Sequence, residues 1–158
     1  MKDLTYLTEK QFIELPPSLL SDKVLPIKLC KLSDKELTLF RESLNCLEQY
    51  MADNDIKIPE DMFALNLCFV ENNEEIILPH PQINLGLIVY HAVYNMTLIR
   101  SYVKTDSKIM TVFLEEMAHH FFFCKNEVKV KYLVYECLKY KYPDLLIEDI
   151  YNKEVLNE

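Results

Sequence analysis

Two consecutive helical segments in the second half of the chain constrain the fold most strongly. Thr105-Asp106-Ser107 offers side-chain oxygens that cap a helix start, and an apolar stripe follows at helical spacing, so we expect a helix from about residue 108 to residue 123. After a break at Lys125-Asn126, the spacing predicts a second helix over residues 127–140, which Pro143 stops.

The first half of the chain mixes one clear helix with segments that favour strands. Ser33-Asp34-Lys35-Glu36 has the form of a capping box and opens an amphipathic helix that ends at Asp53-Asn54-Asp55. Segments 63–70 and 75–78 are apolar and predict two short strands. Segments 87–94 and 97–103 are rich in Val, Ile, Tyr and Thr and predict a hairpin that turns at Asn95-Met96. One buried helix over residues 85–103 is the alternative.

This order of elements predicts an α+β fold: an amphipathic helix, a small and mostly antiparallel sheet, and then two helices. Pro16, Pro17 and Pro26 interrupt the N-terminal residues, so we expect residues 1–31 to form an irregular arm with one short helix near residues 8–14. Residues 32–142 are expected to form the single domain. Residues 143–158 are expected to be an acidic tail that packs on it or near it.

The composition argues against several classes of partner and of site. The formal net charge of −8 argues against nucleic acid as the main partner, because phosphate backbones attract clustered Lys and Arg. No apolar run approaches the roughly 20 residues that cross a bilayer. The single glycine rules out the two common Gly-rich phosphate loops. The five cysteines lack CxxC spacing, and no apolar signal segment opens the sequence, so we expect free thiols in the cytoplasm.

Residues 115–120, Glu-Glu-Met-Ala-His-His, are the cluster best suited to chemistry. A helix advances about 100° per residue, so Glu115 pairs with His119 and Glu116 pairs with His120 on shared faces. The wheel predicts that Glu116 and His120 fall within the buried stripe and that the other pair lies at its border. Burying an unpaired carboxylate is costly, so the pattern requires either a bound metal ion or mutual Glu–His hydrogen bonds.

Residues 112–121 resemble the active helix of minimal zinc metallopeptidases, whose motif is His-Glu-x-x-His. The ImmA/IrrE-like group of mobile-element and stress-response peptidases is the most similar family. In that family two histidines bind zinc, the glutamate between them activates a water molecule, and a glutamate of the next helix completes the site. The resemblance implies a bacterial or phage protein with Glu116 as general base. The implied metal ligands are Glu115, His119 and Glu127, with His120 and Glu136 as second choices.

The choice of Glu127 also follows from its own helix, where it shares a line with the apolar Val130 and Val134 and is expected to face inward. Glu136 lies off that stripe, which is why it is the second choice. Neither position has further support from spacing alone, because an acid at a helix start also interacts favourably with the helix dipole.

Glu115 departs from the family pattern, because it stands where the first histidine is expected. A carboxylate can bind zinc, but an anionic ligand makes the metal a weaker Lewis acid, and an oxygen-rich site also suits iron or manganese. Two hypotheses follow. The chain is a metal-dependent peptidase, or it is a catalytically inactive zincin-like regulator that binds a protein or peptide partner. In the second case Glu116, His119 and His120 form a buried polar cluster.

Overall fold

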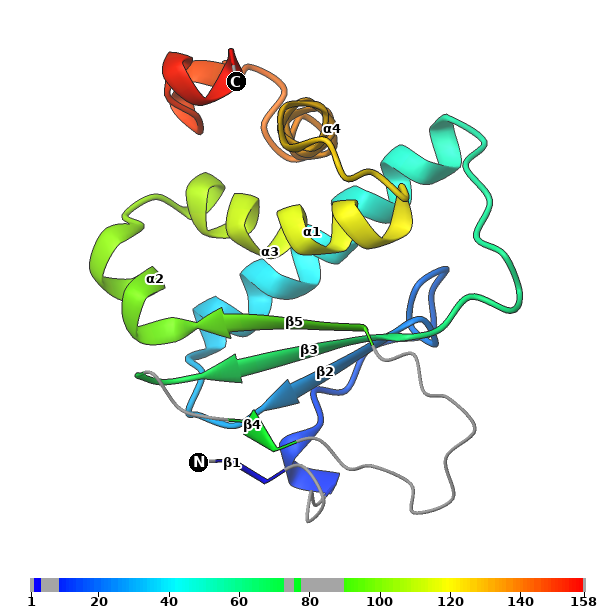
Figure 1. The fold of residues 1–158 in the computed structure, drawn as a ribbon, viewed down its shortest axis with the longest axis vertical. Coiled ribbons are helices and arrows are strands. Elements are labelled where there is room, and N and C mark those ends of the chain that lie inside the picture. Colours follow the sequence, from blue (N-terminus) through cyan, green and yellow to red (C-terminus); the bar gives the residue numbers. More distant parts are fainter. Residues whose placement is uncertain (1, 4–8, 73–75, 78–89, 158) are drawn as a thin grey trace. The chain divides into compact units, whose positions relative to one another are not determined.

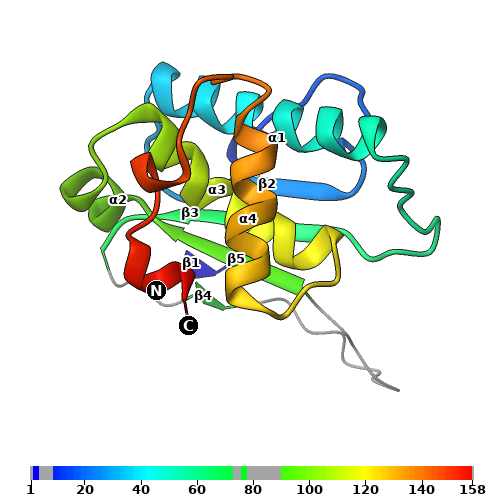
Figure 2. The same cartoon turned by 90° about the horizontal axis from the view of Figure 1, so that it is seen from above.

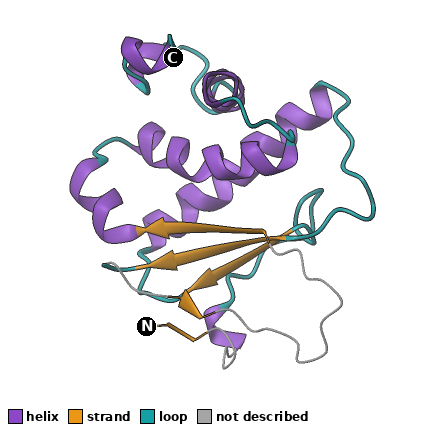
Figure 3. Ribbon diagram, in the orientation of Figure 1, coloured by secondary structure: helices purple, strands orange, loops and turns teal. Residues whose placement is uncertain are grey.

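A computed structural model of the chain describes residues 2–3, 9–72, 76–77 and 90–157. These residues form an α+β fold with two compact units. The sheet unit comprises Met1–Leu32 and Phe63–Tyr102, and the helical unit comprises Ser33–Met62 and Val103–Glu158. Figure 3 distinguishes the helices, strands and loops of both units.

The sheet unit contains three parallel strands in the order β2-β3-β5 (Figure 1). They are β2 (Val24–Lys28), β3 (Leu65–Val70) and β5 (Tyr90–Asn95). Cys68 of β3 is in register with Ile27 on one side and with Val93 on the other. Two short strands, β1 (Lys2–Asp3) and β4 (Ile76–Ile77), form a second parallel pair. A 3-10 helix, η2 (Glu9–Gln11), precedes β2.

The expectation of a mostly antiparallel sheet is therefore wrong. The expectation did not include β2, because β2 lies in the N-terminal segment that was expected to be irregular on account of its prolines. Pro26 lies on β2, and β2 is an edge strand of the three-stranded sheet, where a missing backbone N–H group is tolerated. Parallel neighbours need a long crossover connection, and residues 29–64 between β2 and β3 provide one that includes a complete helix.

The predicted hairpin at Asn95-Met96 is also wrong. β5 ends at Asn95, and α2 (Met96–Tyr102) begins at the next residue. The Asn95 side-chain oxygen accepts a hydrogen bond from the Leu98 backbone N–H at 3.2 Å, so this asparagine caps a helix instead of turning a hairpin. The alternative of one helix over residues 85–103 is wrong for the strand residues 90–95, and residues 85–89 lie outside the described part of the chain.

The two strands predicted over residues 63–70 and 75–78 are present in the structure. The strand expected over residues 63–70 is confirmed as β3. The strand expected over residues 75–78 is confirmed at Ile76–Ile77, while residues 75 and 78 lie outside the described residues.

The helical unit consists of α1 (Asp34–Asp53), α3 (Asp106–Phe121) and α4 (Glu127–Leu138), which contact one another in all three pairs. Figure 2 shows α4 running across the other two helices. The predicted caps are confirmed: Ser33 and Glu36 form a reciprocal capping box, and Thr105 accepts a hydrogen bond from the Lys108 backbone N–H. Asn126 caps α4 in the same way through Lys129.

Aromatic contacts tie the three helices together. Phe40 meets Phe113 edge to face with ring centroids 5.9 Å apart, and both side chains are fully buried. The Tyr140 hydroxyl donates a 2.6 Å hydrogen bond to Asp53, which links the C-terminal ends of α4 and α1. Two 3-10 helices follow, η3 (Ile147–Asp149) and η4 (Lys153–Leu156), with Ile150 and Tyr151 buried between them. None of the helices in the described segments has the length and apolar character needed to cross a membrane.

Candidate functional site

The last two turns of α3 carry the predicted catalytic and ligand residues, and their exposure differs from the wheel. Residues buried along α3 are Met110, Thr111, Phe113, Leu114, Met117, Ala118 and Phe121. Glu116 is exposed, so the prediction that it falls within the buried stripe is wrong. Glu115, His119 and His120 are half-buried. Glu116 lies one turn after Val112 and two turns after Ile109, and both of these apolar residues are only half-buried, so the buried stripe does not extend to Glu116.

His119 is held in a defined orientation. Its Nδ1 lies 2.7 Å from the backbone carbonyl oxygen of Cys124, in the loop between α3 and α4. A carbonyl oxygen can only accept, so Nδ1 carries the hydrogen and donates it. The other ring nitrogen, Nε2, lies 3.4 Å from Oε1 of Glu127. The structure thus brings together two of the three predicted metal ligands.

Glu127 begins α4 and faces solvent instead of the interior. Its side chain is 70% exposed, which corrects the expectation of an inward-facing residue. Burial on α4 begins at Val130 and continues at Val134, whereas Glu127 at the first position of the helix lies outside the buried line. Its second carboxylate oxygen lies 3.9 Å from Nζ of Lys131, one turn further along the helix. The Lys131 side chain is only 17% exposed, so its stem is largely covered while its ammonium group adjoins the pair.

Glu115 belongs to the same electrostatic cluster. Burial raises the pKa of its carboxyl, and the nearby Glu116 and Glu127 carboxylates act in the same direction. The Tyr151 hydroxyl and the Lys131 ammonium oppose this by favouring the charged form. Burial and the Glu115 carboxylate together raise the pKa of Tyr151, whose hydroxyl is buried and makes no aligned hydrogen bond with a described residue. Glu115 is therefore a poorly solvated carboxyl beside one cation and one phenol.

The two second-choice ligands lie in other surroundings. The His120 ring meets Phe121 edge to face with centroids 4.9 Å apart. Glu136 is exposed and lies 3.8 Å from the Lys139 ammonium group. In the part of the chain that the structure describes, no three His, Cys, Asp or Glu side chains gather closely enough to form a complete metal-binding group.

Sequence reasoning missed Lys131, Tyr151 and the Cys124 carbonyl. The Glu127–Lys131 pair has the i, i+4 spacing that a helix brings together, so its signal was present in the sequence. Tyr151 reaches Glu115 through a long-range contact of the C-terminal segment, for which local spacing gives no signal.

No protein-family model, curated protein or solved structure matches this chain. The zincin-like and ImmA/IrrE-like resemblance therefore rests on residues 112–121 and stays a prediction from the sequence. The geometry around His119 provides an independent basis on which to infer a function.

Proposed function

We propose that the protein binds a divalent metal ion at His119 and Glu127, as a zincin-like metal-binding protein. The separation of 3.4 Å between Nε2 and Oε1 carries this proposal. It exceeds the roughly 2.7–3.2 Å of an ordinary N–H···O hydrogen bond. Two ligand atoms that each lie about 2.0–2.1 Å from one tetrahedral zinc ion are roughly 3.3 Å apart. The pair therefore has the spacing of two ligands of one ion.

The orientation of His119 supports the same proposal. Metal-ligating histidines characteristically donate their other ring N–H to a carbonyl or carboxylate, which fixes the tautomer and raises the basicity of the ligand nitrogen. The Cys124 carbonyl plays this part for His119 at 2.7 Å. The partial exposure of His119, 26%, together with the exposed Glu127, leaves the pair open to an ion from solvent.

Glu115 is the proposed third ligand because it lies one turn before His119 on α3 and interacts electrostatically with Glu127, but its side chain must move to join the pair, since the three do not gather closely enough in the described residues. Burial, with the neighbouring Glu116 and Glu127 carboxylates, raises the pKa of Glu115, and a bound divalent cation would favour its charged form. Zinc is the first candidate, and iron and manganese suit the oxygen-rich ligand set as alternatives.

Peptide hydrolysis is the activity that this ligand set favours. A bound divalent ion supplies Lewis-acid catalysis. Glu116 is exposed beside Glu115 and is the proposed general base, which takes a proton from the attacking water. Glu116→Gln is then expected to abolish hydrolysis of a peptide substrate while leaving metal content unchanged.

Elemental analysis of the purified protein tests metal binding. We expect about one equivalent of zinc, iron or manganese per chain, and we expect this metal to be lost in His119→Ala and Glu127→Gln. Glu148→Gln is the control, because it removes an exposed carboxylate of the same unit that is not a proposed ligand, and it should keep the metal. Metal-free wild-type protein that also fails to take up added zinc contradicts the proposal.

The position of the Lys131 ammonium group supports a second candidate function. Its ammonium lies near Glu127 and favours the charged form of Glu115, so it supplies part of the positive charge that a metal supplies in the first candidate. On this account the cluster is a structural link between α3 and α4, and the protein is a catalytically inactive zincin-like regulator that binds a protein partner. An unchanged zinc response in Lys131→Met distinguishes it from the metal-binding account.

A further inference from the structure

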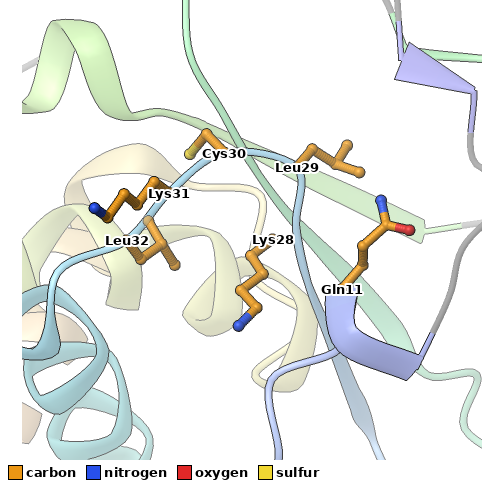
Figure 4. A pocket seen from close by; sticks show the side chains of 6 residues that line it. All are labelled: Gln11, Lys28, Leu29, Cys30, Lys31 and Leu32. Atoms are coloured by element: carbon orange, nitrogen blue, oxygen red, sulfur yellow. The ribbon is translucent and has the colours of Figure 1, made fainter.

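A hollow of about 450 Å³ in the sheet unit does not bring its polar side chains together (Figure 4). Gln11, Lys28 and Lys31 are among the residues that line it. In Figure 4 the two lysine ammonium groups point apart, and the Gln11 amide does not converge with either of them. In the helical unit, by contrast, a buried phenol meets a poorly solvated carboxyl.

This phenol belongs to Tyr151, which lies between η3 and η4 and is 7% exposed. Its hydroxyl oxygen is buried and has no aligned hydrogen-bond partner among the described residues, which include every residue of the helical unit except Glu158. A buried hydroxyl in this state is costly, because it has lost its contact with water without gaining a full hydrogen bond. Its position therefore calls for a partner that can align with it.

The Glu115 carboxyl is the hydrogen-bonding group that acts on this phenol. Burial comes first in raising the pKa of Tyr151, and the charge of Glu115 and its hydrogen-bonding interaction with the phenol add to the effect. Burial raises the pKa of Glu115 as well, and the Tyr151 hydroxyl opposes that rise. The effects are reciprocal because a phenol that donates to a carboxylate stabilises the protonated phenol and the charged acid. The two groups are thus within reach of each other, but they are not aligned.

The segment that carries Tyr151 is anchored independently of Glu115. The Tyr135 hydroxyl of α4 donates a hydrogen bond to the Leu145 carbonyl at 3.2 Å, and Ile150 is buried beside Tyr151. The aromatic ring is therefore the fixed member of the pair. Glu115 is the adjustable member, because its long side chain can rotate about several bonds and must move to join His119 and Glu127.

We propose that Tyr151 is a positioning residue for Glu115, whose carboxylate accepts the phenol on one oxygen and keeps the other for the metal ion. This inference rests on the proposed metal site. An ionised carboxylate has two acceptor oxygens, so both interactions can exist together. Carboxylates that bind metals are themselves hydrogen-bonded to outer partners, which fix their orientation. The Cys124 carbonyl has the same part for His119.

Zinc affinity of the full chain, measured by competition with a fluorescent chelator, tests this proposal in Tyr151→Phe. We expect binding to weaken about tenfold, which is the lower end of the usual effect of losing such an outer partner. Phenylalanine keeps the buried ring and removes only the hydroxyl. Tyr135→Phe is the matched control, because it removes a phenol hydroxyl that anchors the same segment without acting on Glu115, and it should keep wild-type affinity.

A double-mutant cycle separates positioning from a purely structural role. Glu115→Ala weakens zinc binding by itself, and adding Tyr151→Phe to it should cause no further loss, because the hydroxyl acts only through the carboxylate. Circular dichroism establishes that each variant is folded.

Three results overturn the inference while leaving the metal site in place. They are equal zinc affinity of wild type and Tyr151→Phe, an equal loss in Tyr135→Phe, and a further tenfold loss when Tyr151→Phe is added to Glu115→Ala. A wild-type chain that binds no zinc overturns the proposed metal site, and the inference falls with it.

Discussion

His119 and Glu127 face each other from two consecutive helices, with Nε2 of the histidine 3.4 Å from Oε1 of the glutamate. The histidine is anchored at its other ring nitrogen by the Cys124 carbonyl. The glutamate is the first residue of α4 and has its second oxygen near Lys131. An oriented imidazole, an exposed carboxylate and the Lys131 ammonium group therefore lie in succession, 3.4 Å and 3.9 Å apart.

Lys131→Met is expected to strengthen zinc binding by about tenfold, because the variant removes a cation near Glu127 that repels a divalent ion, and because a single charge pair near a surface contributes about 1 kcal/mol or more. Methionine preserves most of the buried aliphatic stem. Competition with a fluorescent chelator measures the affinity. Lys129→Met is the control, since Lys129 is exposed. Unchanged or weaker zinc binding in Lys131→Met counts against the metal site and favours the structural role of the cluster.

Phe123→Gly is expected to raise the free energy of unfolding by about 0.5–1 kcal/mol, because Phe123 has a φ of 50° just after α3, where glycine avoids the Cβ penalty. The phenylalanine side chain is 70% exposed, so its loss removes little burial. Urea denaturation measures the change. Phe123→Ala is the matched control, because it removes the ring without relieving the left-handed backbone. Equal effects of the two variants contradict this explanation.

Tyr140→Phe removes the 2.6 Å hydrogen bond from the Tyr140 hydroxyl to Asp53. That bond raises the pKa of Tyr140 from 10.0 to about 12, because only the protonated phenol can donate to the carboxylate. A raised folded-state pKa means that the stabilisation is complete below pH 10 and is lost as the pH rises towards 12. The stability difference between wild type and variant should therefore be constant up to about pH 10 and shrink above it. A difference that persists undiminished at pH 12 is the opposing result.

Ser33→Ala is expected to lower the free energy of unfolding by about 1 kcal/mol, because it leaves the Glu36 backbone N–H without its capping partner. Thermal and urea unfolding measure the loss. Ser33→Asp is the control that restores an oxygen acceptor at the same position and should recover most of the stability. If alanine and aspartate destabilise the chain equally, the capping box is not what stabilises the start of α1.

The helices could be predicted from the sequence because their signals are local. The expected helix starts were the capping box at Ser33, the segment Thr105-Asp106-Ser107 and the break at Lys125-Asn126. In the structure Ser33, Thr105 and Asn126 cap the three helices. The sheet could not be predicted in the same way, because strand direction depends on contacts between distant segments. Pro26 suggested an irregular arm, yet at an edge strand it is compatible with pairing to Leu67. Asn95 suggested a turn, although the same side chain can cap a helix.

The part of the candidate site that depends on local helical spacing could be predicted from the sequence. The i, i+4 spacing placed Glu115 and His119 on one face of α3. Only a short loop joins α3 to α4, so Glu127 at the start of α4 lies 3.4 Å from His119. The exposure of Glu116 depended on which apolar residues the rest of the unit covers, and Ile109 and Val112 are covered only in part. Tyr151 reaches Glu115 through the fold of the C-terminal segment, which has no local pattern.

Calorimetric titration of metal-stripped protein with zinc tests the central claim most directly. The account predicts one saturable site per chain in the wild type, no such site in His119→Ala, and a wild-type response in Glu148→Gln. Heat that never saturates, or the same titration curve for wild type and His119→Ala, contradicts metal binding at His119 and Glu127.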